Sequence, residues 1–82
     1  MVKLTTKQKI VLEAIEYFIN EYGISPTINE IAKLTNTSTH PTHEKVINLE
    51  KKGVISTLSG KARSIRVIIP LEEIENEEKW LC

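Results

Sequence analysis

The sequence has a single cysteine, no long apolar run and no net charge, and each absence narrows the class of protein it can encode. Because Cys82 is the only cysteine, no internal disulfide can form, and we expect an intracellular protein of the cytoplasm. No apolar run approaches the ~20 residues of a membrane-spanning helix, and the start, MVKLTTKQK, lacks the apolar region of a signal peptide. The 82 residues therefore predict one small globular domain that has no membrane as a partner.

The net charge of zero hides two regions of opposite sign. Residues 1–70 carry ten Lys/Arg against six Glu, a charge of +4, whereas residues 71–82 carry one Lys against five Glu, a charge of −4. We therefore predict a mildly basic domain over 1–70 and an acidic tail over 71–82. The tail is either disordered or a short helix. Such a helix would present one side made of Leu71, Ile74, Glu78 and Leu81.

Two helices follow from capping residues and apolar spacing. Thr5 with a glutamine three residues later is a capping box, and apolar residues then recur every three or four positions up to Gly23. This pattern predicts a helix over 6–22. A second capping box starts at Thr27 and predicts a short helix over 28–34.

The third helix and the segment after it have different periods. TNTS, at 35–38, is rich in turn-forming residues, and the next helix begins within STHP, where Pro41 fits a first turn. Gly53 ends that helix. VISTL and SIRVI then alternate with period 2 around the basic tip SGKAR, which predicts a hairpin. The order is that of an α+β fold, a three-helix winged helix-turn-helix with a C-terminal two-stranded β-hairpin wing.

His40 and His43, at the front of the third helix, have several interpretations. Their spacing would let both reach one ion, but Glu44 lies about 100° around the helix and no Cys-x-x-Cys or His-Glu-x-x-His pattern is present, so we expect no metal. Without a nucleophile or paired carboxylates beside them, we expect no enzyme and no cofactor. They are either solvated residues at a helix start or side chains that read bases. Their place in the second helix of a helix-turn-helix favours base reading.

Hydrogen-bonding chemistry then assigns candidate DNA contacts. Histidine can donate to guanine, glutamate can accept from cytosine, and threonine can bond a base or touch a thymine methyl. The candidate base-reading residues are Thr39, His40, His43, Glu44 and Ile47. The candidate contacts to the DNA backbone are Ser38, Thr27, Lys52, Lys61, Arg63 and Arg66. For the basic residues the alternative is an ordinary solvated loop or a charge that satisfies a helix C-terminus.

Four segments resemble the N-terminal DNA-binding domain of LexA-type repressors: LTTKQKIVLEAI, YGISPTINEIAK, LEKKGVI and SGKARSIRVI. They span roughly residues 3–69, and the pairing of G-x-x-PT-x-x-EIA with GVI…SG-x-x-R-x-IR is their most specific part. The resemblance implies a double-stranded DNA-binding repressor of the SOS response, associated with the nucleoid. It further implies binding to a palindromic operator as a homodimer, with the third helix in the major groove.

The chain departs from the resemblance in two places. LexA proteins continue into a self-cleaving serine–lysine peptidase domain that supplies most of their dimerisation, and the 82 residues leave no room for it. We therefore expect no self-cleavage, and we place candidate dimer or partner contacts in the tail, at Leu71, Ile74, Trp80 and Leu81. The front of the third helix, STHPTHEK, also differs from the family, so the resemblance implies no operator sequence.

Two alternatives remain open. Winged helices also bind proteins, so the chain could be an antirepressor whose acidic tail competes for a basic surface on a host regulatory protein. In the second alternative, the 82 residues are a piece of a longer repressor, and the acidic run is a linker.

Overall fold

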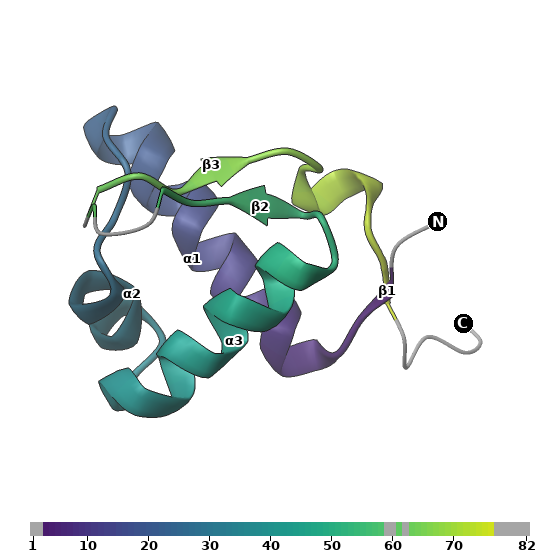
Figure 1. Cartoon of the computed structure of the whole chain (residues 1–82), viewed down its shortest axis with the longest axis horizontal. Helices are drawn as coiled ribbons and strands as arrows, with labels where there is room; N and C mark the ends of the chain where they lie inside the picture. The colour runs from purple at the N-terminus through teal and green to yellow at the C-terminus, as the bar shows by residue number, and fades with distance from the viewer. Residues whose placement is uncertain (1–2, 59–60, 62, 77–82) are drawn as a thin grey trace.

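The computed structural model describes residues 3–58, 61 and 63–76. In chain order, the elements are β1 (Lys3–Leu4), α1 (Thr6–Tyr22), α2 (Ile28–Leu34), α3 (Thr39–Lys51), β2 (Ile55–Ser56), β3 (Arg66–Val67), the 3-10 turn η1 (Leu71–Glu73) and β4 (Glu75–Asn76). Figure 1 shows α3 in front of α1, with α2 near the start of α3 and the β2–β3 hairpin above it. The α+β winged helix-turn-helix predicted from the sequence is therefore confirmed.

Capping side chains and left-handed glycines set the helix ends. The side chains of Thr5 before α1 and Thr27 before α2 each accept a hydrogen bond from the backbone N–H three residues later. In return, the side chains of Gln8 and Glu30 accept a hydrogen bond from the backbone N–H of the two threonines. Gly23 follows α1 at φ +73° and Gly53 follows α3 at φ +78°, which glycine adopts without steric cost. Over the described residues, the structure has no helix with both the length and the apolar character needed to span a membrane.

The helices and the hairpin enclose one apolar core. Its buried members are Leu4, Val11, Leu12, Ala14, Ile15, Ile31, Val46, Leu49, Val54, Ile55 and Ile65. Thr42 of α3 is also buried. Its hydroxyl donates a hydrogen bond to the Ser38 carbonyl at 2.9 Å, so no polar group of this side chain is left unpaired in the core. Because α3 turns Val46 and Leu49 inward, its opposite face is left exposed to solvent.

The hairpin is shorter than the sequence predicts. β2 and β3 pair antiparallel with Ile55 opposite Val67, over two residues in each strand. Nearer the tip, the Leu58 N–H donates to the Ser64 side-chain oxygen, Oγ, at 2.9 Å rather than to a backbone carbonyl of the opposite strand. This side-chain bond closes the end of the hairpin without extending the strands.

The beginning of the tail belongs to the folded domain. Instead of a short α-helix, the chain makes the single turn η1, becomes extended at Ile74, and pairs β4 in parallel with β1. Leu71 and Ile74 pack against the core, and the Leu71 N–H donates to the Glu16 carboxylate at 2.6 Å. The domain thus continues beyond the boundary predicted at residue 70. The prediction missed this because pairing between the two ends of a chain leaves no local pattern.

Candidate nucleic-acid interface

The face of α3 that points away from the core carries the five residues predicted to read bases. All are exposed: Thr39, His40, His43, Glu44 and Ile47. His40 Nε2 and Glu44 Oε2 lie 3.2 Å apart, one helical turn from each other, with the side chains 84% and 63% exposed. Because so exposed a pair contributes little to stability, both groups can exchange their contact for one with a base edge.

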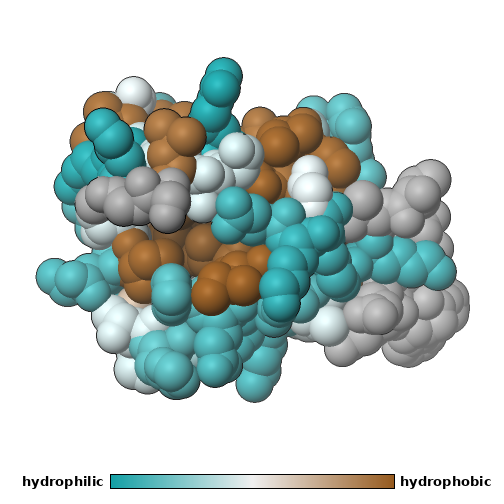
Figure 2. All heavy atoms as spheres, in the orientation of Figure 1, coloured by the Kyte–Doolittle hydropathy of each residue, from teal (hydrophilic) through white to brown (hydrophobic). Residues whose placement is uncertain are grey.

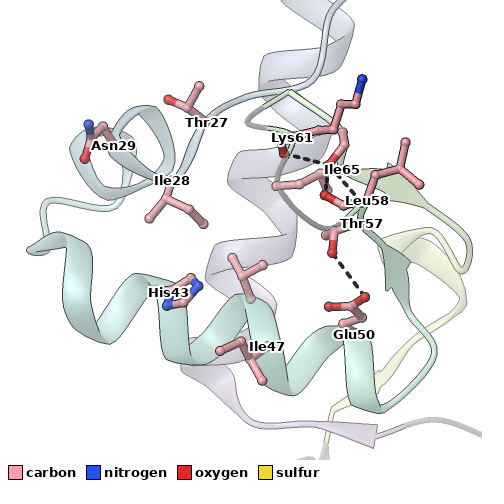
Figure 3. Close-up of a pocket in the computed structure, with 12 residues that line it drawn as sticks. Thr27, Ile28, Asn29, His43, Ile47, Glu50, Thr57, Leu58, Lys61 and Ile65 are labelled. Atoms are coloured by element: carbon pink, nitrogen blue, oxygen red, sulfur yellow. Dashed lines mark hydrogen bonds between the residues drawn. The ribbon is translucent and has the colours of Figure 1, made fainter.

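A hollow of about 490 Å³ lies between α3, the start of α2 and the hairpin. We call it the wing-side hollow. Figure 3 shows His43 and Ile28 facing each other across it, with Lys61 on the hairpin above. Figure 2 shows apolar side chains gathered in the middle of this face. The apolar residues that line the hollow are Ile28, Val46, Ile47, Leu58 and Ile65.

Two of these apolar residues reach the surface. Ile47 is 37% exposed and Leu58 is 62% exposed. An exposed aliphatic side chain beside a polar helix face is the chemistry that contacts a thymine methyl in the major groove. On this side of α3, Glu50 is already bonded, since it accepts from the Thr57 hydroxyl at 3.1 Å (Figure 3).

An ion pair fastens the hairpin to the start of α2. Arg63 Nη2 lies 2.8 Å from Glu30 Oε2, and Arg63 Nη1 donates to Glu30 Oε1 at 3.0 Å and to the Ser25 carbonyl at 2.9 Å. The Ile65 N–H also donates to Ser25 Oγ at 2.9 Å. The Arg63 guanidinium, followed by the Thr27 N–H, lowers the pKa of the Glu30 carboxyl from 4.5 to about 2. The contact fixes where the hairpin lies, whereas its exposure limits its contribution to stability.

The predicted backbone-contact residues do not form one cluster. Thr27 and Lys61 line the wing-side hollow, whereas Arg66 lines a different hollow beside the end of α1. Ser38 is the exposed N-cap of α3, and its side chain makes no capping hydrogen bond. Lys52 lies at the other end of α3, towards the start of α1.

Lys52 has partners of its own. Its ammonium group donates to the Lys3 carbonyl at 2.8 Å and to Gln8 Oε1 at 3.3 Å, which connects the end of α3 to β1 and α1. These two bonds use two of its three N–H donors. The third N–H donor is left for a phosphate. The contact between Lys52 and the DNA backbone remains a prediction.

The tail residues predicted as dimer contacts divide into two groups. Leu71 and Ile74 are partly buried against the core of their own chain. Trp80 and Leu81, and also Glu78, lie outside the described residues. Within residues 3–58, 61 and 63–76, no three His, Cys, Asp or Glu side chains come together as metal ligands.

The sequence prediction missed the pairing of Arg63 with Glu30. The two residues are separated by 33 positions, so neither helical nor strand periodicity relates them. A signal was nevertheless present, because Glu30 is the glutamate of G-x-x-PT-x-x-EIA and Arg63 is the first arginine of SG-x-x-R-x-IR. The two halves of the motif contact each other in the fold.

A helix that follows a tight turn, exposes a polar face and lies beside an antiparallel hairpin defines the winged helix-turn-helix class. The family profile described as "LexA DNA binding domain" matches residues 1–64. The chain belongs to the LexA DNA-binding domain family.

Curated relatives agree with this assignment. The LexA repressor of Thermosipho melanesiensis is 42% identical over 74 residues, covering 90% of this chain and 37% of the relative. That of Marinomonas sp. is 46% identical over 69 residues, covering 83% and 33%. The LexA repressor of Histophilus somni is 41% identical over 75 residues, covering 90% and 36%. The chain thus spans about a third of the length of these relatives.

Proposed function

We propose that the chain binds double-stranded DNA by sequence and represses transcription, acting on the nucleoid in the cytoplasm. The carrying observation is the exposed polar face of α3, beside the hairpin, in a member of the LexA DNA-binding domain family. In this proposal α3 enters the major groove and the hairpin lies over the backbone. Bases are read by Thr39, His40, His43, Glu44 and Ile47, and phosphates are contacted by Ser38, Thr27, Lys61 and Arg66.

The test is selection of binding sites from random double-stranded DNA, followed by competition between the selected and shuffled sequences. We expect an enriched motif and a preference that persists as salt rises, because base contacts carry sequence information and phosphate contacts do not. No enrichment and no DNA binding at low salt would contradict the proposal. No DNA binding at low salt, together with capture of a host repressor by the chain in a separate pull-down, would favour the antirepressor alternative.

We further propose that two copies bind a palindromic operator. One protomer offers few cations, since residues 1–70 carry a net charge of only +4, so a single half-site should be bound weakly. Two linked half-sites raise apparent affinity by effective concentration, by roughly 100-fold or more. The selected motif should accordingly show two-fold symmetry, with half-sites about one helical turn apart or a multiple of it.

The dimer contact is assigned to the end of the tail. A variant that ends at Asn76 keeps β4 and loses Trp80 and Leu81. We expect it to sediment as a monomer and to melt like the full chain, whereas a variant that ends at Pro70 should also melt at a lower temperature. An unchanged mass of the first variant in sedimentation equilibrium would rule out a dimer held by these residues.

A further inference from the structure

We infer that Lys7 and Lys45 form a second phosphate-binding site, on the side of α3 opposite the wing-side hollow. The inference rests on the proposed DNA binding and identifies the contact to the other backbone strand. A hollow of about 640 Å³ separates the first turn of α1 from α3, and its lining includes Lys7, Glu44, Lys45 and Asn48. We call it the α1-side hollow. Lys7 and Lys45 also line a neighbouring hollow together, so both approach the same stretch of surface from different helices.

Groove dimensions give this surface its role. The major groove is about 12 Å wide and an α-helix with its side chains is about 10–12 Å across, so a helix in the groove has a phosphate backbone on each side. Lys45, Asn48 and Lys52 follow one another at three- and four-residue spacing and therefore share one side of α3. When His40, Glu44 and Ile47 face the bases, that side lies about 100° farther around the helix and faces the backbone strand that the hairpin does not reach.

The charges on this surface are available. Among the described residues, the Lys7 and Lys45 ammonium groups make no hydrogen bond and no ion pair. The one carboxylate among the described residues that line the α1-side hollow, that of Glu44, already lies 3.2 Å from His40 Nε2. Long lysine stems can lie along the apolar surface and extend their charged ends towards a phosphate. Two unpaired cations beside the inserted helix thus form an anion site for DNA.

The experiment measures binding to a short duplex of mixed sequence by fluorescence anisotropy at several salt concentrations. Each neutralised phosphate contributes about 0.9 to the slope of log affinity against log salt. We expect Lys7→Gln and Lys45→Gln each to lower the slope by about 0.9 and the double variant by about 1.8. Lys45→Glu should weaken binding further than Lys45→Gln.

Lys9→Gln is the matched control. Lys9 lies on the same helix as Lys7 and carries the same charge, but it points about 160° away around α1. Its slope should equal that of the unaltered chain, and circular dichroism should show that all variants fold. An unchanged slope for the double variant, or an equal loss for Lys9→Gln, would overturn the site. Failure of the unaltered chain to bind any duplex would instead overturn the proposed function.

Discussion

The two sides of α3 differ in how their charged residues are paired. On the wing side, five of the twelve described residues that line the hollow are apolar, and Arg63 of the hairpin is paired with Glu30 of α2. On the α1 side, Lys7 and Lys45 have no partner among the described residues. The ion pair on the wing side therefore fixes the position of the hairpin, whereas the α1 side presents unpaired positive charge.

This difference separates specificity from affinity. In the proposed complex, the hairpin held by Arg63 would keep the exposed face of α3 at a defined place over the bases, which is what discrimination between sequences needs. Unpaired lysines attract any phosphate, with a strength that falls as salt rises. Substitutions on the exposed face of α3 should therefore change sequence preference, and substitutions of unpaired lysines on either side of α3 should change the salt dependence.

The largest effect is expected for His43→Ala, on the boundary between α3 and the wing-side hollow. The variant should lose about 1–3 kcal/mol of discrimination between the selected operator and a sequence changed at the contacted base. Its binding to mixed-sequence DNA at low salt should remain close to that of the unaltered chain. Asn20→Ala on α1 is the control, and competition binding is the measurement. Equal losses for both duplexes would remove His43 from base reading.

Lys61→Gln tests the one lysine that lines the wing-side hollow. Loss of one phosphate contact should reduce affinity for all sequences by roughly eightfold at about 0.1 M salt and lower the salt slope by about 0.9. Anisotropy titrations at several salt concentrations give both quantities. If Lys61→Gln and Lys9→Gln behave alike, the hairpin does not contact the backbone through Lys61.

A smaller effect is expected when the Glu30–Arg63 ion pair is broken. Glu30→Gln keeps the capping box with Thr27 but loses the charge, and Arg63→Gln removes the other partner. If Arg63 acts by holding the hairpin, both variants should lose affinity by similar factors, each smaller than that of Lys61→Gln, with the salt slope unchanged. A slope that falls by about 0.9 for Arg63→Gln alone would identify a direct phosphate contact instead.

The smallest effect concerns pH. The pKa of Glu30 is lowered to about 2 in the folded chain, so this carboxylate stabilises the fold above about pH 4.5 and loses that contribution as the pH falls towards 2. The difference in melting temperature between the unaltered chain and Glu30→Gln should be constant above that range and shrink below it. A difference that does not change with pH would mean that the ion pair does not stabilise the fold.

Local features of the sequence were sufficient for the helices but not for the contacts between distant segments. Thr5, Thr27 and Gly53 determine helix ends through bonds to near neighbours, so the pattern predicts those ends directly. The Arg63–Glu30 pair and the β1–β4 pairing join segments far apart in the chain, and no period links them. The α1-side hollow likewise exists only because α1 packs against α3.

The most direct test of the account is the change in backbone amide chemical shifts as the chain is titrated with the selected duplex. The account predicts the largest changes on the exposed face of α3, at His43 and Ile47, with further changes on both sides, at Lys61 and Lys7. The exposed residues Tyr22 and Ile68, which lie outside the proposed interface, should not change. Changes confined to such residues, with α3 unaffected, would contradict the claim that α3 is the helix that meets DNA.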